Sequence, residues 1–222
     1  MSYQENSMQT SSSLTLEASK VLKNTYMLLG ITLLFSALTA GAAMMLNVGR
    51  IGGMISSLAA IAIIWLVLPR TANSEKGILT TFAFTGLLGF GLGPVLNHYL
   101  QTAQGTQVVM QALAGTGIIF LTLSAYVLTT KKDFSFMAGF LMVGMIVAFV
   151  AIIANIFLAI PVLSLAISAA IVFIMSGMIL FETSNIIHGG ERNYILATCS
   201  LYMSIYNLFV SLLQLLGIMG DD

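Results

Sequence analysis

The sequence predicts an all-α, polytopic integral membrane protein, a bundle of seven transmembrane helices. Of its 222 residues, 58% are apolar and only 7% are charged, whereas about 25% of the residues of a soluble domain are charged. Apolar runs of about 20 residues recur along the chain, and this is the length that an α-helix needs to cross a bilayer. Nearly all charged residues lie in the tails or between these runs. We therefore expect the lipid bilayer to be the main surroundings of the chain.

Seven runs are long enough to span a membrane. They are Asn24–Leu46, Ile51–Leu68, Gly77–Leu96, Val108–Leu128, Phe134–Leu158, Val162–Ile187 and Tyr194–Ile218. The connectors between them are short, so we expect neighbouring spans to pack as helical hairpins and expect no soluble domain. Pro69, Pro94 and Pro161 fall at or near the ends of the predicted spans, where a proline interrupts little helix.

The segment before the first span is rich in Ser, Thr, Gln and Asn, and it cannot bury enough apolar surface to fold alone. It lacks the basic start and apolar core of a signal peptide, so we expect the first span to be a retained anchor. We predict a disordered cytoplasmic tail at residues 1–19 and a transmembrane domain at residues 20–222. The tail is either a solvated leader without function or a flexible handle for another protein.

The basic residues predict how the helices cross the membrane. Seven of the eight lie on one side of the predicted bundle: Lys20, Lys23, Arg70, Lys76, Lys131, Lys132 and Arg192. Arg50 lies on the other side. Basic residues are enriched on the cytoplasmic side of membrane proteins. We therefore expect a cytoplasmic N-terminus and, after an odd number of spans, a C-terminus on the outer side.

Small residues mark one face of the third span. Gly89 and Gly93 form a GxxxG pair, Gly86 lies one turn earlier on nearly the same face, and Pro94 follows. Small residues allow helix backbones to approach closely in lipid. We predict that this face packs against another helix of the same chain. Homo-oligomerisation through it, or a hinge near Pro94, stays open as an alternative.

Polar residues in the last two spans predict one candidate functional site. Glu182 is the only charged residue within a predicted span, and a carboxylate at membrane depth costs roughly 2.5–3.5 kcal/mol. On the last span, positions spaced alternately by four and three residues share one helical face. These positions are Asn193, Ala197, Ser200, Ser204, Asn207, Ser211 and Gln214. Such a face suits the bundle interior better than lipid, so we expect the last helix to be central.

We group Glu182 and Asn185 on the sixth span with Ser200, Ser204 and Asn207 on the seventh as this candidate site. One interpretation is a polar network that only specifies packing, in which a neutral Glu182 donates a hydrogen bond to a hydroxyl or an amide. The other is a proton- or cation-responsive site whose charge state sets the arrangement of the helices.

Several function classes are excluded or disfavoured by the sequence. The net charge of zero gives no electrostatic footprint for nucleic acid. A single cysteine, Cys199, allows neither an intrachain disulfide nor a cysteine metal cluster. The sequence contains no HExxH zinc motif and no GxSxG nucleophile turn. We therefore expect a protein that is not an enzyme and that holds no cofactor or metal.

Four sequence stretches carry a family resemblance. The stretch Gly91–Leu96 resembles the GP-containing signature of the Bax inhibitor-1 family, and Phe181–Gly190 is similar to the end of the sixth helix in its bacterial YccA branch. Lys20–Tyr26 and Tyr126–Asp133 resemble the same branch, and the similarity covers nearly the whole chain beyond residue 18. The resemblance implies a seven-helix bundle with a central last helix. For this branch it also implies a non-enzymatic inner-membrane modulator, and slow substrate, of the membrane-anchored AAA protease FtsH.

Other branches of the family are linked to a calcium leak that a pair of carboxylates on helices six and seven gates. Glu182 matches the position of the first acid, but the second acid position falls at Ser204. The alternative function is therefore a pH-sensitive cation leak or transporter in which Glu182 is the titrating group. One carboxylate with neutral hydroxyls would bind calcium weakly, because calcium prefers several oxygen ligands that include carboxylates.

Overall fold

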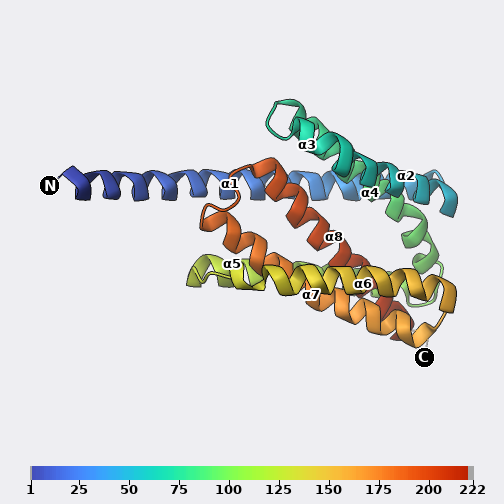
Figure 1. The fold of residues 1–222 in the computed structure, drawn as a ribbon. Coiled ribbons are helices and arrows are strands. Elements are labelled where there is room, and N and C mark those ends of the chain that lie inside the picture. The colour runs from blue at the N-terminus through green and yellow to red at the C-terminus, as the bar shows by residue number, and fades with distance from the viewer. Residues whose placement is uncertain (1, 220–222) are drawn as a thin grey trace. The chain divides into compact units, whose positions relative to one another are not determined.

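The computed structural model describes the backbone of residues 2–219 and the side chains of residues 16–218, and within these bounds it consists of helices and turns (Figure 1). The α-helices are α1 (Ser2–Met45), α2 (Arg50–Ala62), α3 (Leu68–Thr71), α4 (Lys76–Leu100), α5 (Gly105–Thr130), α6 (Ala138–Leu158), α7 (Pro161–Ile187) and α8 (Tyr194–Met219). A π-helical segment, η1 (Ile63–Val67), joins α2 to α3, and a 3-10 turn, η2 (Ser135–Met137), precedes α6.

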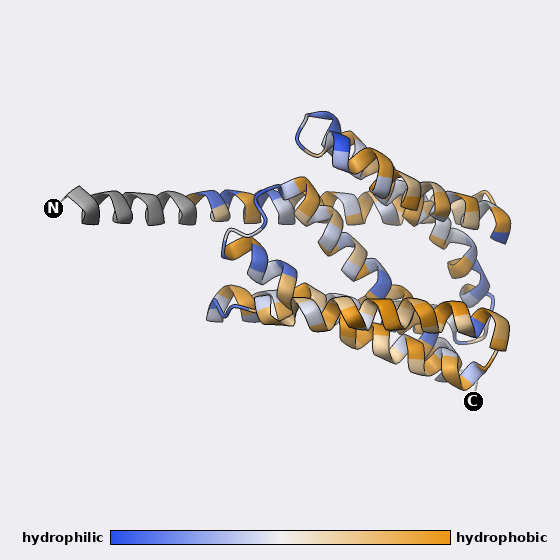
Figure 2. Cartoon of the chain, in the orientation of Figure 1, coloured by the Kyte–Doolittle hydropathy of each residue, from blue (hydrophilic) through white to orange (hydrophobic). Residues whose placement is uncertain are grey.

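Seven helical stretches are long and apolar enough to cross a membrane, which confirms the predicted number of spans. They are Leu16–Met45, Arg50–Thr71, Lys76–Leu100, Gly105–Thr130, Ser135–Leu158, Pro161–Ile187 and Tyr194–Ile218. Figure 2 shows apolar residues along these helices and hydrophilic residues concentrated at their ends and in the connectors. The fold class predicted from composition and periodicity is therefore correct.

The second span is less regular than its apolar sequence suggests. It combines α2, η1 and α3, and at its π-helical part the N–H of Leu68 bonds to the carbonyl of Ile63, five residues earlier. Pro69 follows directly. A proline has no N–H to donate and its ring crowds the preceding turn, so a wider turn relieves the helix at this point.

One predicted boundary differs from the structure and another stays untested. The backbone of α1 is drawn as helix from Ser2, and the predicted division into a disordered tail at residues 1–19 and a transmembrane domain at residues 20–222 stays a prediction. That residues 1–19 serve as a flexible handle for another protein also stays a prediction. Pro94 lies inside α4 rather than at a span end, because α4 continues to Leu100.

The chain forms two compact units. The first contains Met1–Asn97 and Asn185–Tyr202, and the second contains His98–Ser184 and Met203–Asp222. Helix α8 contributes fully buried side chains to each: Leu201 and Tyr202 to the first unit, and Leu208 and Leu213 to the second. A helix at the centre of a bundle buries side chains along its length. The central position of α8 stays a prediction.

In the first unit, the glycine face of α4 packs against α1. A Cβ atom built on Gly89 would lie 2.2 Å from the carbonyl oxygen of Ser36, and one on Gly93 would lie 2.4 Å from Cβ of Ala43. A Cβ on Gly86 would meet the ring of Phe35 at 2.6 Å. The structure therefore shows the predicted intrachain packing, in which these three glycines contact α1 of the same chain.

A second face of α4 packs against α2 in the same unit. A Cβ on Gly53 would lie 2.8 Å from Cγ of Pro94, so the proline ring fills the space that the glycine leaves. The hydroxyl of Ser56 donates to the carbonyl of Leu87 at 2.7 Å. Close backbone contact and a hydroxyl-to-carbonyl bond are what hold helices together in lipid, where the hydrophobic effect between helices is absent.

The second unit is built on a buried apolar cluster. Leu141 of α6, Ile174, Met175 and Ile179 of α7 and Leu208 of α8 form its centre. Leu141 packs directly against Gly177, because a Cβ built on Gly177 would lie only 2.7 Å from Cδ2 of that leucine. Only 6% of the α6 span is buried, so most of its apolar surface faces outward. That surface suits lipid.

Candidate membrane-embedded carboxyl site

The carboxyl group of Glu182 is buried within the second unit. Its side chain is 7% exposed, and it lies on α7, five residues before the helix ends at Ile187. The hydroxyl of Ser204, on α8, donates to Oε2 of Glu182 at 3.1 Å. Ser204 itself is 2% exposed. The structure thus joins the two residues that the family resemblance aligns with a pair of acids.

The turn between α7 and α8 explains why these helices present their polar residues at matching positions. The carbonyl of Asn185 accepts from the N–H of Gly190 at 2.9 Å, and Gly189 has a positive φ of 75°. A Cβ on Gly190 would lie 2.0 Å from Oδ1 of Asn185, so a side chain there would displace this amide. Asn185, predicted as part of the site, lies in the last turn of α7 and belongs to the first unit.

Ser184 fixes the position of α7 just beyond Glu182. Its hydroxyl accepts a hydrogen bond from the N–H of Phe134 at 2.9 Å and donates to the carbonyl of Lys132 at 3.3 Å. The connector between α5 and α6 is therefore tied to α7 two residues from the carboxyl group. Sequence reasoning missed this contact. A buried serine at a span end, which needs a partner, was the available signal.

The remaining predicted site residues have other surroundings. Asn207 is half-buried and directs its amide nitrogen to the carbonyl of Met203, 2.9 Å away in its own helix. Ser200 is exposed and belongs to the first unit. Of the predicted group, the structure therefore brings together Glu182 and Ser204. Asn207 shares their unit, and Asn185 and Ser200 do not.

The deeper end of the polar face on α8 forms a separate network in the second unit. The amide of Gln214 donates to Ser164 at 2.5 Å, and the hydroxyl of Ser168 donates to the carbonyl oxygen of Gln214 at 2.9 Å. Ser211 is buried. These bonds satisfy polar groups in an apolar surrounding and hold α8 against α7, which is a packing role.

The first unit contains a polar centre that the sequence did not predict. The phenol of Tyr202 is 1% exposed, lies 2.5 Å from the hydroxyl of Ser36 and donates to the carbonyl of Thr85 at 3.2 Å. Its ring packs edge-on against Phe84. One side chain of α8 thereby bonds to both α1 and α4. A buried tyrosine hydroxyl usually has a partner, so a tyrosine within a span was the signal for this contact.

The chemistry available to the Glu182 site is narrow. The carboxyl group of Glu182 can accept the hydrogen bond from Ser204 whether or not it carries a proton. Among the described residues, no group of three or more His, Cys, Asp or Glu side chains is close enough to hold a metal ion. Calcium takes six to eight oxygen ligands, and Glu182 and Ser204 supply one carboxyl group and one hydroxyl group toward such a set.

Comparison with known proteins identifies the family. The sequence profile described as "Inhibitor of apoptosis-promoting Bax1" matches residues 18–221. The chain belongs to the Bax inhibitor-1 family. Its seven apolar helices and this membership agree in describing a multi-pass membrane protein.

Several bacterial proteins are similar to this chain over almost their whole length. The protein named modulator of FtsH protease YccA, from Escherichia coli K12, is 53% identical over 207 residues, which is 93% of this chain and 94% of that protein. The inner membrane protein YccA of Escherichia coli O6:H1 gives the same values. A membrane protein of Vibrio cholerae is 51% identical over 208 residues, or 94% of this chain and 93% of its own.

Proposed function

We propose that this protein is a non-enzymatic modulator, and a slow substrate, of an FtsH-type membrane protease in the bacterial inner membrane. The observation that carries the proposal is its 53% identity, over 93% of the chain, to a protein named modulator of FtsH protease. The match covers 93% of this chain and 94% of the relative. This supports transferring the relative's role to this protein, because the matched part of the relative is almost its whole length.

The structure limits where such a protease can make contact. The connectors between the seven candidate spans are two to six residues long. We therefore propose that the protease contacts the outward faces of the helices and the N-terminal end of α1. We propose that this end is cytoplasmic, because seven of the eight basic residues lie on the same side of the predicted bundle.

Helix α1 begins well before the apolar run that we predict as the first span. The helix starts at Ser2 and the predicted run starts at Asn24, so 22 residues of α1 precede the run. At 1.5 Å per residue they form about 30 Å of helix. An ATP-driven protease begins to pull at an accessible end, and a single helix without a soluble domain around it resists little.

Once pulling begins, the packed helices resist extraction. The close contacts of α4 with α1, and the bond of Tyr202 to Ser36 of α1, must break before α1 leaves the first unit. A substrate that enters easily and unfolds slowly occupies the protease and delays the degradation of other substrates. This is how a chain without catalytic groups modulates proteolysis.

Degradation in reconstituted membranes tests the proposal. Purified FtsH-type protease is placed in vesicles with a membrane substrate, with and without this protein in equal amount. We expect slower degradation of the substrate in its presence, and loss of this inhibition when residues 1–19 are deleted. Unchanged degradation of the substrate would contradict the modulator function. Inhibition that survives the deletion would contradict only the proposal that residues 1–19 are the handle.

A second candidate function is a pH-sensitive cation leak in which Glu182 titrates. The bond between Ser204 and a buried carboxyl group at membrane depth favours it. Vesicles that contain the protein and a calcium-sensitive dye test it between pH 6 and 8, with Glu182→Gln as the matched variant. Leak that the variant abolishes would support this function. A flux equal to that of empty vesicles would eliminate it.

A further inference from the structure

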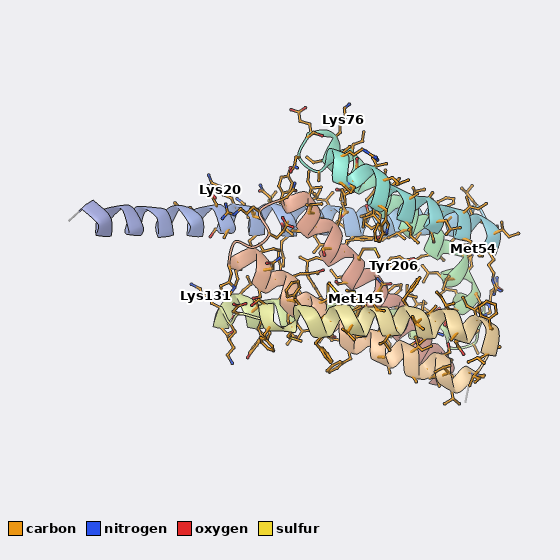
Figure 3. All side chains as sticks on the ribbon, in the orientation of Figure 1. Lys20, Met54, Lys76, Lys131, Met145 and Tyr206 are labelled. Atoms are coloured by element: carbon orange, nitrogen blue, oxygen red, sulfur yellow. The ribbon has the colours of Figure 1, made fainter. Side chains whose placement is uncertain are left out.

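A cationic connector lies at the end of α5 in the second unit. Helix α5 ends at Thr130, and Lys131 caps it in the left-handed conformation, with φ of 51° and its N–H bonded to the carbonyl of Val127 at 2.8 Å. Lys132 follows, and both lysines are exposed. Figure 3 labels Lys131 at this end of the helix. Two adjacent positive charges therefore stand at the boundary of the span.

The ammonium group of Lys132 is held in place by an aromatic neighbour. Its Nζ atom lies 3.1 Å from the hydroxyl of Tyr126 and 5.6 Å from the centre of the same ring. The ring of Tyr126 packs against Phe134 with centroids 6.2 Å apart, and Phe134 stacks on Phe136 at the same distance. Tyrosine side chains are enriched at the level of the lipid headgroups.

The connector is also rigid. Ser184 binds the N–H of Phe134 and the carbonyl of Lys132, so the backbone on both sides of Asp133 is fixed to α7. The carboxylate of Asp133 accepts from the N–H of Ser135 at 2.8 Å. With two lysines and one aspartate, this stretch has a net charge of +1. A preorganised cationic group loses little freedom when it binds an anion.

An apolar face begins immediately after this connector. Helix α6 exposes large apolar side chains along its length, among them Phe140, Val143, Val147 and Val150, each at least 58% exposed. The spacing of three to four residues places them along one side of the helix. A ligand that matches both features has an anionic head and long apolar chains.

We propose that Lys131 and Lys132 bind the phosphate group of an anionic phospholipid whose acyl chains lie along the outward face of α6. Lys132 is positioned for this by Tyr126, and Lys131 by its place as the helix cap. Two other basic groups bond within the protein: the guanidinium of Arg70 donates to the carbonyl of Leu66, and Nε of Arg192 donates to that of Gly189.

Native mass spectrometry of the full-length protein in detergent tests the site, with equal amounts of phosphatidylglycerol and phosphatidylcholine added. We expect a clear preference for phosphatidylglycerol. A lysine near an anionic lipid surface contributes about fivefold in affinity. The double variant Lys131→Gln/Lys132→Gln should therefore bind phosphatidylglycerol about 25-fold more weakly, while Lys131→Arg/Lys132→Arg keeps most of the affinity.

The pair Lys20 and Lys23, also exposed and on α1 in the first unit, provides the matched control. Lys20→Gln/Lys23→Gln removes the same charge and should leave the preference unchanged. An equal loss in both double variants, or no preference in the natural protein, would overturn the proposal. Competition by soluble glycerol phosphate as strong as that by phosphatidylglycerol would also overturn it, because the acyl chains would then contribute nothing.

Discussion

The hydroxyl of Ser204 lies 3.1 Å from Oε2 of Glu182, and both side chains are buried in the second unit. Burying a charged group costs free energy unless it is paired and hydrogen-bonded. We therefore expect the charge of this carboxyl group to affect how α7 and α8 pack.

The first prediction concerns the pH dependence of stability. Proton loss from Glu182 would introduce a charge into the packed unit, so we expect ionisation of this carboxyl group to lower the stability. The thermal stability of the natural protein in detergent should fall between pH 6 and pH 9. Glu182→Gln cannot ionise and should flatten this dependence. The matched control is Glu75→Gln in an exposed connector, which should leave the slope unchanged. Equal slopes for all three proteins would show that Glu182 is not the titrating group.

The second prediction tests the contact between α4 and α1. Gly89→Ala places a methyl group 2.2 Å from the carbonyl of Ser36, and backbone must move to admit it. We expect a loss of about 1–3 kcal/mol in the free energy of unfolding. Gly41→Ala is the control, since a Cβ at Gly41 has nothing within 4 Å. Denaturation in mild detergent compares the two, and similar stability of both variants would contradict the close approach.

The third prediction concerns the hydrogen bond between Tyr202 and Ser36. Tyr202→Phe keeps the ring and removes the hydroxyl, so it should lower stability by about 1–2 kcal/mol. Ser36→Ala removes the other partner. If the two hydroxyls bond to each other, the double variant should be less destabilised than the sum of the single variants. Strict additivity in a double-mutant cycle would mean that the bond does not form in the membrane protein.

The fourth prediction separates two roles of Asn193 at the start of α8. Its Oδ1 accepts from the N–H of Ile195 at 2.9 Å, and its Nδ2 donates to Ala72 and Asn73 of the connector before α4, at 2.9 and 2.8 Å. Asn193→Ser keeps the helix cap and gives up the connector bonds. Asn193→Ala gives up both and should cost about 1 kcal/mol more than serine. Equal unfolding free energies of the two variants would remove the capping role.

The sequence was sufficient for the features that depend on periodicity and composition. Apolar length predicted the seven spans, and small-residue spacing predicted that Gly86, Gly89 and Gly93 meet another helix of the same chain. The pairing of Glu182 with Ser204 was also within reach, because both positions follow from counting back along two helices that share a short turn.

The sequence was insufficient where a choice between nearby partners decides the outcome. Asn207 lies on the predicted polar face, yet its amide bonds to the carbonyl of Met203 in its own helix, a local alternative that helix periodicity cannot rank. Ser200 is exposed although it shares that face. The partners of Tyr202 and Ser184 come from residues far away in the chain, so only the packed fold identifies them.

Co-purification tests most directly whether this member of the Bax inhibitor-1 family acts on an FtsH-type protease, as we propose. The full-length protein, tagged at its C-terminus, is isolated from native membranes under mild detergent together with a proteolytically inactive protease that traps its substrates. A seven-span membrane protein of similar size, tagged in the same way, serves as the control. We predict that the protease is enriched with this protein and not with the control. Recovery of equal amounts of protease from both would contradict the account.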